Sequence, residues 1–161
     1  MIPLILIILV LLVLGWQDIR NRSVWVFLFP LLFVFSLWYK WDTLQLSQCL
    51  WNLGFLVFSF LGLTFYLTIK ERQLVAIWKG YFSWGDILYL LSIVPLLIFS
   101  SYLIYFTFGT IVTLLIHTAV LLTQRKATKT IPYAGYMALV LVVYLYVEST
   151  LLNEFTLLTI D

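Results

Sequence analysis

The chain alternates between long apolar runs and short polar segments. A membrane-spanning helix needs about 20 mostly apolar residues, and fewer where it is tilted or anchored at its ends. Runs of this kind occupy residues 2–16, 24–39, 49–69, 87–99, 102–122 and 133–152. We therefore predict an all-α protein, a polytopic membrane helix bundle of about six transmembrane helices, folded as a single domain over residues 1–161.

The polar segments between these runs predict the loops. They cover residues 17–23, 40–48, 70–86 and 123–132, and the serine pair Ser100–Ser101 predicts a hinge between the fourth and fifth runs. The first apolar run has no basic residues before it and no small-residue cleavage site after it, so we expect a permanent helix rather than a signal peptide.

The basic residues predict the orientation, because short loops rich in Lys and Arg stay in the cytoplasm. With six spans the loops alternate between the two sides of the membrane, and Lys40 is then the only basic residue on its side. We therefore expect both chain termini to lie outside the cytoplasm. The basic residues on the predicted cytoplasmic side are Arg20, Arg22, Lys70, Arg72, Lys79, Arg125, Lys126 and Lys129.

Composition supports a lipid environment and limits the chemistry. Hydrophobic residues make up 64% of the chain and charged residues 10%, against about 25% charged in soluble domains. The net charge of +2, without a basic stripe, gives no reason to expect a nucleic-acid partner. With one cysteine, Cys49, and one histidine, His117, we expect no disulfide framework, metal site or cofactor. His117 is expected to form a helix–helix hydrogen bond.

Two acidic residues stand at the predicted cytoplasmic ends of apolar runs. Asp18 follows the first run and Asp86 precedes the fourth, so the topology places both on the same side of the membrane. Two carboxyl groups that share one proton can act as an aspartic protease dyad. Position alone also allows a structural reading, in which Asp18 is a solvated partner of Arg20 and Arg22, and Asp86 caps the following helix.

Three short segments resemble the type IV prepilin peptidases, in the order found in that family. Residues 18–24, Asp-Ile-Arg-Asn-Arg-Ser-Val, resemble its first catalytic segment, in which a basic stretch including Arg20 follows the aspartate. Ser83-Trp-Gly85-Asp86 is similar to its G-x-G-D motif, which presenilin-type proteases share. Residues 129–139, which contain Pro132, are similar to its Ile-Pro-Phe-Gly-Pro-Phe-Leu-Ala segment.

The chain departs from the family pattern at three positions. Ser83 replaces the first glycine of G-x-G-D, Leu88 replaces a lysine, and Trp25 replaces a proline. A glycine with positive φ would be costly to replace by serine. Both aspartates are retained.

The resemblance implies a single transmembrane peptidase-like domain in a bacterial or archaeal cytoplasmic membrane. It implies an aspartic endopeptidase, with Asp18 and Asp86 as the catalytic pair, that removes the leader peptide of prepilin-like membrane proteins at the cytoplasmic face. Many bacterial members also methylate the new N-terminus with an added region that carries paired cysteines. This chain has one cysteine, so it resembles the short, peptidase-only form.

Two alternatives remain open from the sequence. The departures at Ser83, Trp25 and Leu88 are compatible with a non-catalytic membrane subunit or small transporter related to these peptidases. A lipoprotein signal peptidase is a membrane aspartic protease of similar length, but it has fewer spans and its carboxylates work at the extracytoplasmic face. The sequence does not specify the substrate, the oligomeric state or which aspartate is the base.

Overall fold

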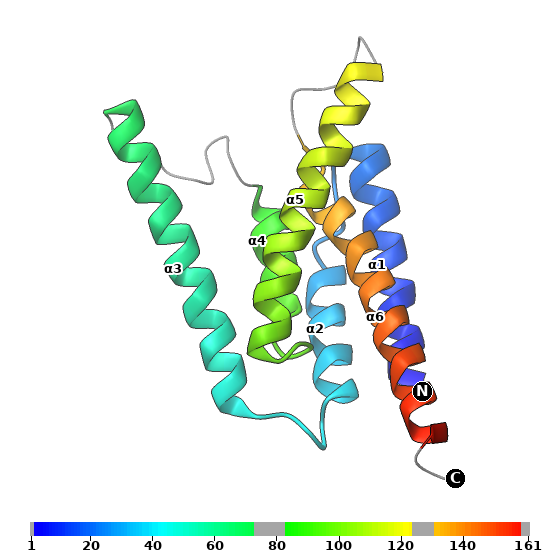
Figure 1. Cartoon of the computed structure of the whole chain (residues 1–161). Coiled ribbons are helices and arrows are strands. Elements are labelled where there is room, and N and C mark those ends of the chain that lie inside the picture. The colour runs from blue at the N-terminus through cyan, green and yellow to red at the C-terminus, as the bar shows by residue number, and fades with distance from the viewer. Residues whose placement is uncertain (1, 73–82, 124–130, 159–161) are drawn as a thin grey trace.

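A computed structural model describes residues 2–72, 83–123 and 131–158, and in this part of the chain every regular element is an α-helix. The six helices, labelled in Figure 1, are α1 (Ile2–Asn21), α2 (Leu28–Tyr39), α3 (Leu46–Glu71), α4 (Trp84–Ser92), α5 (Phe99–Thr123) and α6 (Tyr133–Leu158). The predicted all-α class is therefore confirmed. The basic residues Lys79, Arg125, Lys126 and Lys129 of the orientation argument lie outside the described residues.

The lengths of the helices support a membrane protein. Three of them, α1, α3 and α5, are long and apolar enough to cross a bilayer, and α2 and α6 contain shorter apolar stretches. Helix α4 has nine residues and rises only about 14 Å, less than half of the hydrocarbon thickness of about 30 Å. Because α4 ends at Ser92, the continuous helical span predicted at 87–99 is too long.

Pro95 explains the short fourth helix. A proline disfavours helical backbone at the residue before it and lacks an N–H for the helical ladder. The chain leaves the helix after Ser92, turns through residues 93–98 and starts α5 at Phe99. The hinge predicted at Ser100–Ser101 is therefore wrong, because both serines lie inside α5.

Two of the other helix bounds that differ from the prediction affect residues of the motifs. Helix α1 continues to Asn21, so Asp18 lies in its last turns rather than at its end. Arg22, with φ 55°, then adopts the left-handed conformation that commonly follows a helix. Helix α2 starts at Leu28, four residues later than predicted, which puts Pro30 in the first turn, where a missing N–H costs nothing.

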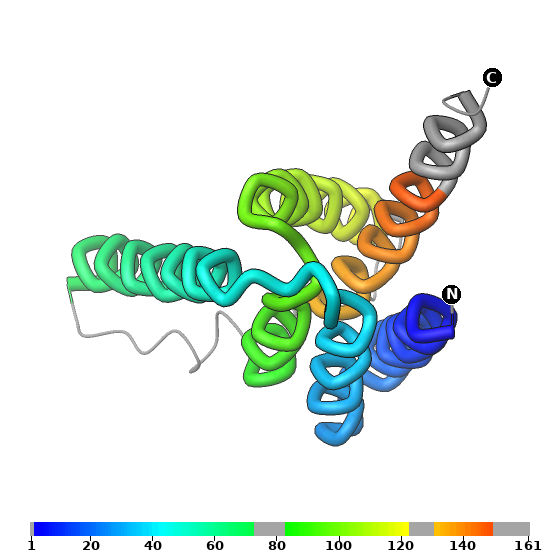
Figure 2. The backbone as a smooth tube through the Cα atoms, turned by 90° about the horizontal axis from the view of Figure 1, so that it is seen from below, coloured from blue at the N-terminus to red at the C-terminus, as the bar shows by residue number. Residues whose placement is uncertain are grey.

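Helix α1 packs against α2 and α6, while α4 lies between α2 and α6, and α5 contacts α6 and α3 (Figures 1 and 2). Helix α3 leans away from the others in both views. It is joined to the bundle at one end, where the Asn52 side-chain N–H groups donate to the carbonyls of Val94 (2.9 Å) and Leu97 (2.8 Å).

Buried tyrosines connect α4, α5 and α6. The Tyr105 hydroxyl donates to the Met137 carbonyl at 2.7 Å and lies 2.6 Å from the Tyr89 hydroxyl. The Tyr133 hydroxyl lies 2.9 Å from the Thr110 hydroxyl. These bonds satisfy polar groups that the bundle removes from water, and they fix where α6 begins relative to α4 and α5.

Candidate active site

Asp18 reaches the start of α6 from the last turns of α1. Its Oδ2 accepts a hydrogen bond from the Gly135 N–H at 2.7 Å, a contact between residues 117 positions apart. Gly135 makes this approach possible, because a Cβ there would lie 3.0 Å from both Cβ and Oδ2 of Asp18. Gly15, about one turn earlier on α1, also faces Gly135: a Cβ added at Gly15 would lie 3.4 Å from the Gly135 carbonyl oxygen.

Asp86 reaches the same helix start from α4. Ser83 and Asp86 form a reciprocal capping box at the start of α4: the Asp86 N–H donates to the Ser83 Oγ at 3.2 Å, and the Ser83 N–H donates to the Asp86 Oδ2 at 2.9 Å. The other carboxylate oxygen, Oδ1, accepts from the Ala134 N–H at 3.0 Å. The Asp86 side chain is 6% exposed.

The two carboxylates therefore bind consecutive peptide N–H groups in the first turn of α6. These N–H groups have no partner within their own helix, and the helix dipole places partial positive charge there, so the site favours negative charge. Two ionised carboxylates would repel each other at this position, and such a repulsion acts between Asp18 and Asp86.

Burial and hydrogen bonding have opposite effects on the pKa of Asp86. Burial raises the pKa of the Asp86 carboxyl above its ordinary value, because removal from water disfavours the charged form. Hydrogen bonds from Ser83 and Ala134 partly offset this rise in pKa, since they stabilise the carboxylate. Asp18 is only partly buried, so the site retains access to solvent.

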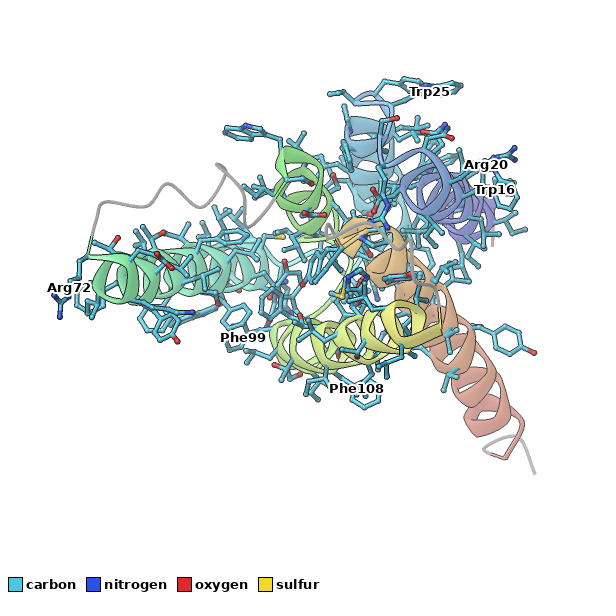
Figure 3. All side chains as sticks on the ribbon, turned by 90° about the horizontal axis from the view of Figure 1, so that it is seen from above. Trp16, Arg20, Trp25, Arg72, Phe99 and Phe108 are labelled. Carbon is cyan, nitrogen blue, oxygen red and sulfur yellow. The ribbon has the colours of Figure 1, made fainter. Side chains whose placement is uncertain are left out.

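The supporting residues of the motifs have distinct positions. Gly85 lies in the first turn of α4 beside Phe29, and Pro132 immediately precedes α6 and is buried. Arg20 does not face the carboxylates. Its guanidinium carbon lies 5.5 Å from the centroid of the Trp16 ring, and Figure 3 shows its side chain pointing outward from α1. Within the described residues, the charge of Arg22 favours the ionised form of Asp18.

The departures from the family pattern fit this backbone. Ser83 has φ −79°, an ordinary value for any residue, so the first position of the motif needs no glycine, and serine caps the helix. Trp25 donates its backbone N–H to the Gln17 side-chain oxygen at 3.2 Å, a bond that a proline could not make. Its ring stacks on Phe27.

Among the described residues, His, Cys, Asp and Glu form no group of three or more that could hold a metal ion. His117 is 5% exposed, and its Nδ1 has no hydrogen-bond partner in the described part of the chain. The predicted helix–helix hydrogen bond is not found at this atom.

The sequence did not reveal the amides that hold the carboxylates. The donors are backbone groups of Ala134 and Gly135, and a backbone N–H has no sequence signature. The only available signal was Gly135 itself, within the segment that resembles the family's Ile-Pro-Phe-Gly motif.

Comparison of the chain with protein-family models, curated proteins and solved structures finds no match.

Proposed function

We propose that this protein is an intramembrane aspartic endopeptidase of the prepilin peptidase type, with Asp18 and Asp86 as its catalytic pair. One observation carries the proposal: carboxylates from two helices, distant in sequence, bind consecutive N–H groups at the start of a third helix. The three motif segments supply these parts: Asp18, the Ser83–Asp86 capping box, and the start of α6 after Pro132.

In this proposal the two carboxyl groups share one proton. The ionised aspartate takes a proton from a water molecule, whose oxygen attacks the carbonyl carbon of the scissile peptide. The protonated aspartate donates its proton to the carbonyl oxygen, which gives a tetrahedral diol intermediate. As the C–N bond breaks, the aspartate that took the water proton donates it to the leaving nitrogen, and one diol hydroxyl returns its proton to the other aspartate, which releases the leader and restores the pair. The amides of Ala134 and Gly135 hold both carboxyl groups toward one reaction centre.

The proposed substrate is a prepilin-like membrane protein with a short leader before an apolar helix. Six membrane segments, both termini outside the cytoplasm and cleavage at the cytoplasmic face of a bacterial or archaeal membrane complete the proposal. Asp18 and Arg22 lie at the same end of α1, in the polar segment that the basic residues assign to the cytoplasm.

A structural role for the same two carboxylates is the competing function. The oxygens that bind Gly135, Ala134 and Ser83 all act as helix caps, and a non-catalytic membrane subunit could use them only to join α1 and α4 to α6. Asparagine separates the two roles best at Asp18, because its side-chain oxygen still accepts the one hydrogen bond from Gly135 while its amide cannot exchange a proton. At Asp86, where both oxygens accept, asparagine keeps only one of the two bonds, so the rate is compared at equal amounts of folded protein.

The test is a processing assay with Asp→Asn variants. A panel of tagged prepilins is co-expressed with the wild type, Asp18→Asn, Asp86→Asn, or the control Asp42→Asn, whose side chain is exposed between α2 and α3. We expect the first two variants to lose about 10²–10⁴-fold in rate, the typical contribution of general acid–base catalysis, and the control to cleave normally. Normal processing by both site variants would contradict the catalytic role and leave only the structural capping role.

A further inference from the structure

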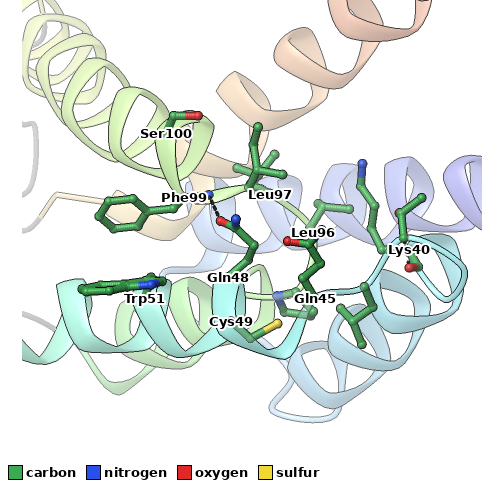
Figure 4. Close-up of a pocket in the computed structure, with 13 residues that line it drawn as sticks. Lys40, Gln45, Gln48, Cys49, Trp51, Leu96, Leu97, Phe99 and Ser100 are labelled. Atoms are coloured by element: carbon green, nitrogen blue, oxygen red, sulfur yellow. Dashed lines mark hydrogen bonds between the residues drawn. The ribbon is translucent and has the colours of Figure 1, made fainter.

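A polar cavity lies at the end of the bundle opposite the two aspartates. It has a volume of about 780 Å³ and is bounded by the end of α2, the start of α3 and the start of α5. Figure 4 shows Lys40 at one end of it and Trp51 and Phe99 at the other. The polar residues that line the cavity are Lys40, Thr43, Gln45, Gln48 and Ser100.

An apolar trench of about 580 Å³ continues from this cavity between α2, α3 and α4. The two spaces share three lining residues, Leu44, Cys49 and Pro95, so they adjoin, with a polar end and an apolar end. The lining of the trench includes Phe29, Phe33, Leu37, Leu53, Leu88 and Leu91.

Among the described residues, Lys40 is the one cation that lines the polar end. The exposed Asp42 follows it by two residues, and the charge of Glu148 acts on the neighbouring Tyr39. The Lys40 ammonium lies 5.2 Å from the centroid of the Tyr39 ring, a contact that does not neutralise it. Gln48 uses its side-chain oxygen to accept from the Phe99 N–H at 3.0 Å, and the same amide group carries two N–H donors. A cation beside neutral donors suits a phosphate group.

The apolar end has about the length of one leaflet. On α2 the trench runs from Phe29 to Leu37, about 12 Å at 1.5 Å per residue, against about 15 Å for half of a hydrocarbon core. Trp41 and Trp51, 73% and 66% exposed, mark the interface at the polar end.

We propose that the cavity and the trench together bind one anionic phospholipid, with its phosphate at Lys40 and one acyl chain between α2, α3 and α4. The bound lipid fills the space that α3 leaves as it leans away from α4, and so supports the helix that Asn52 anchors at this end. This site is independent of the proposed peptidase activity.

Cys49 provides the assay, because it is the only cysteine of the chain and lies where cavity and trench meet. The protein is purified in a neutral detergent, and the rate at which a small thiol reagent labels Cys49 is measured against added dioctanoyl phosphatidylglycerol. We expect the lipid to slow labelling severalfold. Dioctanoyl phosphatidylcholine should act only at higher concentration, because it carries no net charge.

Three variants test the cation. Lys40→Gln should require about tenfold more phosphatidylglycerol for the same protection, as expected for loss of one charged hydrogen bond. Lys40→Arg should keep the wild-type response. The control Lys70→Gln removes an exposed cation from the opposite end of α3 and should also respond as the wild type.

Three results would overturn the proposal. One is equal protection of the wild type and Lys40→Gln by phosphatidylglycerol. Another is protection by inorganic phosphate as strong as that by the lipid at the same concentration, which would assign the site to a free anion. The third is protection by a synthetic prepilin transmembrane helix but not by phosphatidylglycerol, which would assign the trench to a peptide.

Discussion

A methyl group added at Gly135 tests how closely the proposed reaction depends on the placement of Asp18. A Cβ at this position would lie 3.0 Å from Cβ and Oδ2 of Asp18 and 3.1 Å from Cγ1 of Ile19. Carbon atoms pack at about 3.5–4.0 Å, so Gly135→Ala must move α1 and α6 apart by about 0.5 Å or more. The 2.7 Å bond from the Gly135 N–H to Asp18 then lengthens toward the limit of a hydrogen bond.

The magnitude of the effect follows from that bond. A hydrogen bond to a charged group contributes about 1.5–3 kcal/mol, and each 1.4 kcal/mol of barrier is a factor of ten in rate. We expect Gly135→Ala to lower kcat/KM for prepilin cleavage by about 10–100-fold. Overpacking should also lower the free energy of unfolding by about 1–3 kcal/mol.

The assay compares cleavage rates and thermal unfolding of Gly135→Ala with those of Gly62→Ala. Gly62 lies in α3, where an added Cβ would meet nothing within 4 Å, so this control should cleave as the wild type and be slightly more stable. Wild-type cleavage by a folded Gly135→Ala variant would refute the reasoning, because Asp18 would then work without this contact.

The remaining predictions concern the capping box and the buried polar groups. The Ser83 hydroxyl also forms a hydrogen bond with the Asp86 carboxylate that lowers the pKa of this group. Ser83→Ala removes that bond, so the pH profile of cleavage should move to higher pH, while Ser83→Thr, which keeps the hydroxyl, should not move it. Asn52→Leu leaves two carbonyls between α4 and α5 without their donor and should lower stability by about 1–3 kcal/mol in thermal unfolding. Tyr105→Phe should cost a similar amount, because its hydroxyl donates to a carbonyl of α6. Unchanged melting temperatures for both variants would contradict these assignments.

The apolar runs predicted where most of the helices lie. A helix in a membrane must be apolar over about 20 residues whichever helices it contacts, so the run is visible in the sequence alone. They failed at the fourth helix, because the apolar residues after Pro95 continue the run while the proline ends the helix. The hydrophobic pattern also missed the last turn of α1, which is polar but still helical up to Asn21.

For the site, the sequence predicted Asp18 and Asp86 on one side of the bundle, and the structure places both at the start of α6. It could not predict how they are held, because the donors are backbone amides whose position depends on helix packing. Arg20 was misplaced for a different reason. Helix α1 continues to Asn21, and residues two apart on a helix do not face each other, so Arg20 turns toward Trp16, four residues earlier.

The most direct measurement is cleavage of a purified prepilin by the purified protein in proteoliposomes, which removes any contribution from host peptidases. The account predicts a released leader peptide for the wild type and Asp42→Asn, and a loss of about 10²–10⁴-fold in rate for both Asp18→Asn and Asp86→Asn, with all four proteins folded. Cleavage at the wild-type rate by either folded site variant would contradict the assignment of that aspartate to the catalytic pair.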